Sequence, residues 1–170
     1  MAARDPKDVF LTLLSDVRQN TERAVKVYQE MGQTAQDPEI KEALEARAFV
    51  SEKTLEKLDQ CFKLIGEQPV KRTGHLQEVF LEDFRKELNE IHSPIAKRLF
   101  ILAKLGHLIH LRIGEYVVLI GAADLAGHHG VGVLLESCLA DKMAFVERNR
   151  HLIRHVIEAK VGERKSVAAA

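Results

Sequence analysis

A polar residue interrupts the apolar face of each of four long helical segments, near the middle of the segment. The four residues are Thr21, Arg47, Arg112 and Asp141. In a four-helix bundle these positions fall at similar depth, where bundles of this kind build metal sites. Arginine carries only donors and stays protonated, so this set is unsuited to holding a cation. The pattern predicts a buried ion-pair layer, with Asp141 as the favoured counter-ion and Glu115 as the other candidate.

A second interpretation of the two arginines places their charges in water. Arg47 and Arg112 could extend along their aliphatic stems to the surface of the bundle. The substitution Asp141→Ala separates the two cases. It costs about 3 kcal/mol or more if Asp141 belongs to a buried pair, and almost nothing if the charges are exposed.

Histidine pairs are the other candidates for metal chemistry. His107 with His110, and His151 with His155, have the one-turn spacing that two ligands on a helix need. Neither pair has a glutamate base in a zincin arrangement or an obvious third ligand nearby in the sequence. No nucleophile elbow, phosphate loop or paired-acid motif accompanies them. The sequence therefore favours a protein that is not an enzyme.

Size and charge limit the classes of function. At 170 residues and 46% hydrophobic content, the chain is expected to form one domain over residues 1–170, with a core from about 6 to 162 and a frayed tail at 163–170. The 25 basic and 25 acidic side chains cancel, so no global field attracts nucleic acid. The most apolar stretch, 99–126, contains charged residues throughout, which predicts a buried helix and no membrane span.

The two cysteines and the first residues suggest a compartment. Cys61 and Cys138 fall at apolar positions without a CxxC pair, which predicts buried free thiols and a reducing environment. The charged start, residues 1–8, lacks the apolar region of a signal peptide. We therefore expect a cytoplasmic protein.

Helix boundaries are marked by an N-cap residue followed by proline, which occurs three times: Asp5-Pro6, Asp37-Pro38 and Ser93-Pro94. Together with glycine stops and apolar periodicity, these signals predict four long helices and one shorter one. The expected helices are 6–31 ending near Gly32, 38–65 ending at Gly66, a short helix around 76–88, 93–126, and 131–161 ending at Gly162. A tight turn is expected at 127–130.

These elements predict an all-α protein with a ferritin-like layout. Two antiparallel helix pairs are joined by a long connection, and the short helix packs outside the bundle or at its end. The 93–126 helix is apolar nearly all round, so either the short helix or a second subunit must cover it. A homodimer is therefore expected.

Three stretches resemble a known family: 37–41 (DPEIK), 58–69, and 110–116 followed by Gly127. They are similar to the bacterial ferritin-like proteins of the YciE/YciF type, over roughly 10–152. The resemblance implies a ferritin-like fold. Members of that family are described as proposed metal-binding stress proteins that dimerise, with Glu and His on four facing helices as in di-iron carboxylate proteins.

The resemblance fails at the positions where the metal ligands would lie. The first-helix glutamate falls at Thr21, the second-helix histidine at Arg47 and its following acid at Val50. In the fourth segment the acids fall at Ile109 and Arg112. The last helix keeps Asp141, with Lys142 beside it where a second acid is expected. The family's di-metal site is therefore expected to be lost, and no cofactor is expected.

The leading hypothesis is thus a non-catalytic ferritin-like protein with a structural or interaction role, and the resemblance adds the expectation of a stress setting. It would act as a homodimer or through an unidentified protein partner. The alternative is a metal-dependent oxidase or iron-handling protein, in which a rearranged site of His107, His110, Glu115 and Asp141 holds iron or manganese. A third hypothesis is a module whose interior binds an apolar ligand.

Overall fold

The computed structural model describes residues 5–71 and 74–168, and the side chains of the last helix up to Val161. Its described residues form five helices and no strand. The helices are α1 (Pro6–Thr34), α2 (Pro38–Ile65), α3 (Leu76–Glu90), α4 (Pro94–Leu125) and α5 (His129–Ala168). The predicted all-α class is confirmed.

The three predicted N-caps are present, each followed by proline in the first turn. The Asp5 carboxylate accepts from the Asp8 amide at 2.9 Å, and Asp37 accepts from two amides at the start of α2. Ser93 caps α4 in the same way. At the other end of α2, Gly66 has a φ of 71°, the left-handed conformation that glycine adopts without a steric cost.

Two glycines predicted to end helices do not end them. Gly32 lies inside α1, which continues to Thr34. The last helix begins at His129, two residues earlier than expected, and passes Gly162 to reach Ala168. A glycine inside a helix costs only about 1 kcal/mol relative to alanine, so a sequence of helix-forming neighbours overrides it. The backbone of 163–168 is thus helical, while 169–170 lie outside the described residues, and fraying of the tail from residue 163 stays a prediction.

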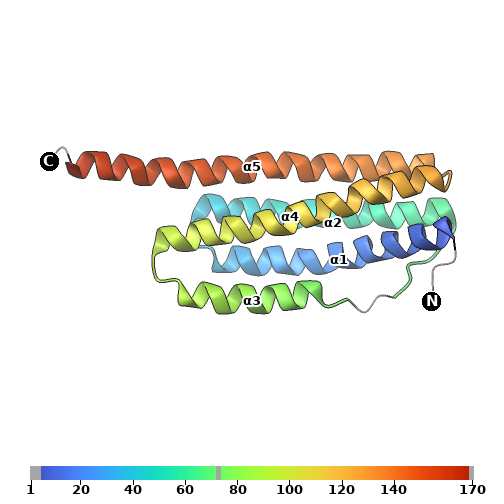
Figure 1. Ribbon diagram of the computed structural model, residues 1–170, viewed down its shortest axis with the longest axis horizontal. Helices are drawn as coiled ribbons and strands as arrows, with labels where there is room; N and C mark the ends of the chain where they lie inside the picture. Colours follow the sequence, from blue (N-terminus) through green and yellow to red (C-terminus); the bar gives the residue numbers. More distant parts are fainter. Residues whose placement is uncertain (1–4, 72–73, 169–170) are drawn as a thin grey trace.

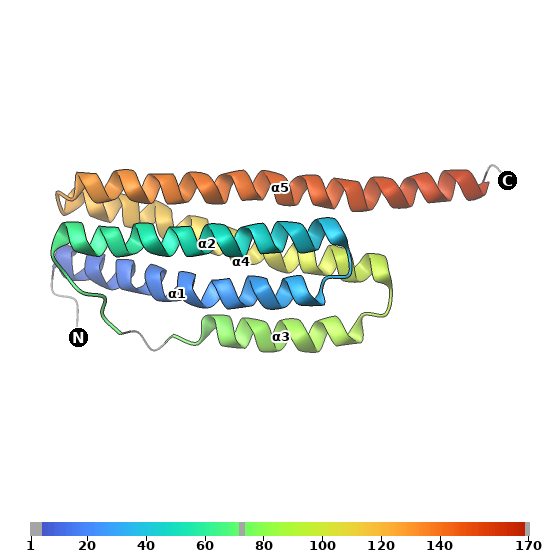
Figure 2. The ribbon, with the colours of Figure 1, turned by 180° about the vertical axis from the view of Figure 1, so that it is seen from behind.

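The helices form a four-helix bundle with one additional helix on its outside. α1 packs against α2, and α4 against α5; the two pairs meet through α1 with α4 and α2 with α5. α3 packs against α1 and α4, and Figures 1 and 2 show it beside α1 on the outer side. The long connection from α2 to α4 contains α3, as predicted. Both views also show the C-terminal part of α5 extending beyond the ends of the other helices.

The apolar core is divided along the bundle axis into two clusters. One contains Tyr28, Leu44, Ile109 and Phe145 among others, and the second contains Val17, Leu58, Tyr116 and Cys138. Buried polar residues occupy the space between the two clusters. Along the described part of the chain, no helix is both long enough and apolar enough to cross a membrane.

Candidate functional site

A polar layer lies in the middle of the bundle, and every bundle helix contributes to it. Its members are almost completely buried, with exposed fractions between 1% and 4%; they are Thr21 of α1, Arg47 and Ser51 of α2, Arg112 of α4 and Lys142 of α5. Along each of α1, α4 and α5, the polar residue separates residues of one apolar cluster from residues of the other. On α5, for example, Lys142 lies between Cys138 of one cluster and Phe145 of the other. The layer thus contains three basic side chains.

Arg112 has a carboxylate partner. Its Nη1 donates to Oε2 of Glu115 at 2.6 Å, one turn along the same helix. Burial raises the pKa of Glu115, and the nearby Arg112 opposes that rise. The second terminal nitrogen of Arg112, Nη2, is buried without a hydrogen-bond partner among the described residues. This side of the layer is therefore a nearly neutral ion pair with one unsatisfied donor.

Arg47 has aromatic neighbours in place of a carboxylate. Its Cζ lies 5.6 Å from the ring centroid of Tyr28 and 5.5 Å from that of Phe145. Its Nε and Nη1 are buried and lack hydrogen-bond partners within the described structure. Aromatic faces attract a guanidinium with about 0.5–2 kcal/mol each, which offsets only part of the cost of burying the charge.

Lys142 is the third cation of the layer. Its Nζ lies 3.9 Å from the centroid of the Tyr116 ring, and it donates to the Cys138 carbonyl at 3.5 Å. Burial, reinforced by the positive charge of Arg47, lowers the pKa of Lys142 to about 7. The amine is therefore partly neutral near physiological pH, which reduces the charge that the interior must hold.

The hydroxyl groups of the layer are mostly satisfied within their own helices. Thr21 Oγ1 donates to the Val17 carbonyl at 2.7 Å, and Ser51 Oγ to the Arg47 carbonyl at 2.9 Å. The Tyr116 hydroxyl lies near Thr21. Its distances and angles to the described residues, however, do not reach those of a hydrogen bond. Burial raises the pKa of Tyr116, so this phenol stays protonated.

Both arginines are held inside the bundle, at 3% and 2% exposure, so neither extends to the surface as the second interpretation required. Of the two predicted counter-ions, Glu115 pairs with Arg112, whereas the favoured one, Asp141, pairs with neither arginine. Asp141 points away from the layer, is 41% exposed, and pairs with Lys57 of α2 at 3.1 Å. Its neighbour Lys142 occupies the inward position on α5. At this turn of α5 the inward residue is therefore one position later than the sequence interpretation placed it.

The remaining predicted positions do not form a metal site. Ile109 is buried in an apolar cluster and Val50 is half-buried. His107 and His110 are exposed on α4, and the Nδ1 of His110 donates to the Gly106 carbonyl at 2.9 Å. Within the residues that the structure describes, no three His, Cys, Asp or Glu side chains lie together so that they could hold a metal ion. The rearranged set of His107, His110, Glu115 and Asp141 is thus not brought together.

These observations decide whether the di-metal centre implied by the family resemblance fits this chain. Such a centre needs several carboxylates that neutralise the ions in a dry interior. The layer instead holds two guanidinium groups and an amine, with Glu115 already bonded to Arg112. The residues present do not fit two divalent ions.

Two buried residues had no role in the sequence interpretation. Tyr116 is one of them, and its ring is the main neighbour of the Lys142 amine. Asn149 is buried at 6% exposure, and its Nδ2 donates to the Leu102 carbonyl at 3.2 Å across the α4–α5 interface. Apolar spacing identifies Tyr116 as inward-facing, while Asn149 carries no signal that distinguishes it from a surface residue.

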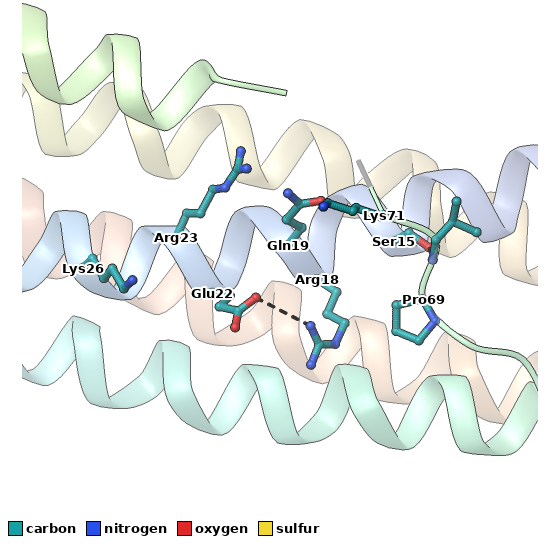
Figure 3. Close-up of a pocket in the computed structure, with 9 residues that line it drawn as sticks. Ser15, Arg18, Gln19, Glu22, Arg23, Lys26, Pro69 and Lys71 are labelled. Carbon is teal, nitrogen blue, oxygen red and sulfur yellow. Dashed lines mark hydrogen bonds and ion pairs between the residues drawn. The ribbon is translucent and has the colours of Figure 1, made fainter. Parts of the chain in front are cut away.

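A polar surface cleft of about 380 Å³ lies between α1 and the segment that follows α2. Figure 3 shows the charged side chains that line it, including Arg18, Glu22, Arg23 and Lys26. Arg18 pairs with Asp59 at 2.6 Å and with Glu22 at 3.7 Å, while Arg23 donates to the Gly74 carbonyl. Both arginines of the cleft therefore already have partners. Among the described residues that line the cleft, no nucleophile is in contact with a base.

Comparisons with known proteins agree with the fold. The structure of the stress protein YciF from E. coli has a TM-score of 0.85 with this chain at 18% identity, covering 91% of this chain and 98% of that one. YcfI from Rhodopseudomonas palustris, for which a structural role is proposed, has a TM-score of 0.82 at 22% identity, with coverages of 87% and 94%. A protein from Xanthomonas campestris pv. campestris has a TM-score of 0.68 at 20% identity, with coverages of 95% and 99%.

The resemblance to YciF-type ferritin-like proteins is therefore confirmed at the level of the fold. No curated protein sequence matches the chain significantly. A family model does match, over residues 5–162, and almost the whole bundle lies within that range. The chain thus belongs to the family described as a domain of unknown function, DUF892.

Proposed function

We propose that this protein is a non-catalytic ferritin-like bundle with a structural or interaction role, in which the family's di-metal site has been lost. The supporting observation is the polar layer, where Arg47, Arg112 and Lys142 are buried and Glu115 is the one carboxylate of the described residues that pairs with a member of the layer. Fixed positive charges at this depth repel divalent ions, and no cofactor is required to explain the arrangement.

The cellular setting is part of the proposal. One solved structure with this fold is called a stress protein, and a structural role is proposed for a second. We extend a stress-related structural role to this chain on that basis. Cys61 and Cys138 are buried free thiols, and burial raises the pKa of both, which suits a reducing cytoplasm. The balanced charge supports a protein partner over nucleic acid.

The partner that the surface supports best is a second copy of the chain. An apolar stripe runs along the outer face of α4 with alternating steps of three and four residues: Leu111, Gly114, Val118, Gly121 and Leu125. Leu111, Val118 and Leu125 are 42%, 59% and 84% exposed. A methyl group added to either glycine would meet nothing within 4 Å, so both leave open space at the helix surface.

This α4 stripe has the spacing of a helix-pairing seam. Its glycines allow close approach of a second helix, and a groove of about 720 Å³ lined by Leu111, Gly114 and Val118 runs beside it against α1. A stripe without charge at its centre is self-complementary, as a two-fold symmetric interface requires. The proposed homodimer therefore pairs α4 with α4 of the second copy.

Metal content tests the first part of the proposal. Protein purified without an affinity tag, from cells supplied with iron, manganese and zinc, is subjected to elemental analysis. We expect far less than one equivalent of any of these metals per chain. Close to stoichiometric iron or manganese would favour the oxidase or iron-handling alternative. In that case Glu115→Ala, which removes the carboxylate paired with a member of the layer, would show whether the ions lie there.

Sedimentation tests the homodimer. We expect a dimer at micromolar concentration, and Val118→Glu should convert it to a monomer because it places a charge in the seam. Leu64→Glu on α2 is the matched control, since Leu64 is 58% exposed and Val118 59%, and Leu64 lies outside the stripe. A monomeric wild-type protein, or equal effects of the two substitutions, would remove the α4 interface from the proposal.

A further inference from the structure

Arg47 is a buried cation without a counter-ion. Its side chain is 3% exposed, and no described carboxylate lies within ion-pair distance. The rings of Tyr28 and Phe145 contact its guanidinium, but Nε and Nη1 donate to nothing that the structure describes. An uncompensated buried charge costs several kcal/mol, so a neighbouring negative charge would stabilise the bundle substantially.

Arg47 also lines a cleft that opens at the seam between α2 and α5. The cleft has a volume of about 250 Å³, and Val50, Phe145, Asp141 and Arg148 contribute to its lining together with two alanines. Its walls next to Arg47 are therefore mostly apolar. The cleft gives a small solute a route to the neighbourhood of the buried guanidinium.

The other charges of this cleft are already compensated. Asp141 pairs with Lys57 at 3.1 Å, and Arg148 pairs with Glu42 at 3.0 Å. Lys142 is next to Asp141 in the sequence, but its amine lies against the Tyr116 ring on the inner side of α5. Arg47 therefore leaves the cleft with one unbalanced positive charge.

We propose that this cleft binds one weakly hydrated monovalent anion, of the chloride class, beside Arg47. A single negative charge in the cleft balances the one unpaired guanidinium, and their attraction is strong because mostly apolar walls screen it weakly. A multiply charged oxyanion would be repelled by Asp141 and would lose more hydration against Val50 and Phe145. The site is independent of any metal and of the α4 stripe.

Chloride NMR tests the proposal directly. The line width of ³⁵Cl⁻ is measured with wild-type protein at increasing chloride, and bromide is then added as a competitor. We expect excess broadening that saturates and is reversed by bromide, and loss of at least nine-tenths of it in Arg47→Met. Arg148→Met is the matched control. It removes a cation from the same cleft, but one that Glu42 already neutralises, so chloride affinity should change by less than twofold.

A second variant keeps the charge and removes the space. Val50→Phe fills the cleft without altering Arg47, and we expect it to weaken chloride binding by at least tenfold while the circular dichroism spectrum is unchanged. The proposal is overturned if wild-type protein shows no saturable broadening, if Arg47→Met broadens the line as wild type does, or if Arg148→Met has the larger effect.

Discussion

The two sides of the polar layer hold the same kind of side chain in different ways. On the α4 side, Arg112 bonds to the Glu115 carboxylate at 2.6 Å. On the α2 side, Arg47 lies between two aromatic rings and has no carboxylate partner in the described structure. A paired buried charge is sensitive to the loss of its partner, whereas an unpaired one is already costly and can be removed at little expense. Removing the partner of Arg112 should therefore destabilise the fold, whereas removing the Arg47 charge should cost little or stabilise the fold.

The largest expected effect is at the paired side. Glu115→Ala leaves Arg112 buried without a counter-ion, and we expect a loss of about 3 kcal/mol in the free energy of unfolding, because breaking a buried pair costs about 3–5 kcal/mol and Glu115 is partly exposed. Urea unfolding followed by circular dichroism measures it.

The control for this substitution is an ion pair at the surface, with the same sequence spacing and nearly the same N–O distance. Lys53 and Glu56 are also three residues apart, at 2.7 Å, but 53% and 65% exposed. Glu56→Ala should cost less than about 1 kcal/mol. If the two substitutions cost the same, burial does not distinguish the Arg112 pair.

Lys142 should make stability depend on pH. Its folded pKa of about 7 lies below the ordinary lysine pKa of 10.5, so the unfolded chain binds more protons between these values and stability rises with pH. From pH 7 to about pH 8, below the ordinary thiol pKa of about 8.5, the expected gain is about 1 kcal/mol. Urea unfolding across this window measures the slope.

The same series with Lys142→Met isolates that contribution. Methionine replaces most of the lysine stem with an unbranched apolar chain and removes the titrating amine, so the slope attributable to Lys142 should vanish. An identical pH slope in wild type and variant would show that the amine does not change its protonation in this range.

A smaller effect is expected at the unpaired side. Arg47→Met removes the buried charge and its unsatisfied donors, but also two ring contacts. The free energy of unfolding should therefore fall by less than about 1 kcal/mol, or rise. The measurement is made with fluoride as the only halide, because chloride binding would stabilise the wild type. A loss of about 3 kcal/mol would indicate that Arg47 is held as strongly as Arg112.

The smallest effect is expected at Asp141. Its pair with Lys57 is exposed to 41% on the aspartate and 31% on the lysine, so Asp141→Ala should lower the free energy of unfolding by no more than about 1 kcal/mol. Thermal unfolding of the variant beside wild type checks this. A cost near that of Glu115→Ala would restore Asp141 as a counter-ion of the layer.

The helices were predictable because their boundaries depend on local chemistry. Asp5, Asp37 and Ser93 cap helices through bonds to amides two or three residues away, and Gly66 adopts a backbone conformation that other residues avoid. The predicted helix end at Gly162 was wrong because a glycine allows a helix to end but does not require it. The periodicity of buried residues likewise placed Arg47 and Arg112 inward.

Glu115 was predictable as a partner of Arg112 because it lies one turn away on the same helix, but the places of Asp141 and Lys142 were not predictable. Asp141 and Lys142 are adjacent, and both lie near the edge of the inward face of α5, since successive residues are about 100° apart around a helix. Lys142 is inward because its long stem reaches the Tyr116 ring on α4. Asp141 is outward because Lys57 on α2 can pair with it there. Both contacts join helices that are distant in sequence, and no local pattern encodes them.

The part of α5 that extends beyond the bundle has a consequence for amide exchange. Among the α5 residues whose side chains are described, Val156 is the last in the apolar core, and Ile157 and Val161 are 48% and 46% exposed. A single helix without tertiary contacts is marginally stable in water and opens rapidly from its end. Deuterium should therefore enter the amides after Val156 much faster than those near Cys138, giving one continuous helix two very different protection levels.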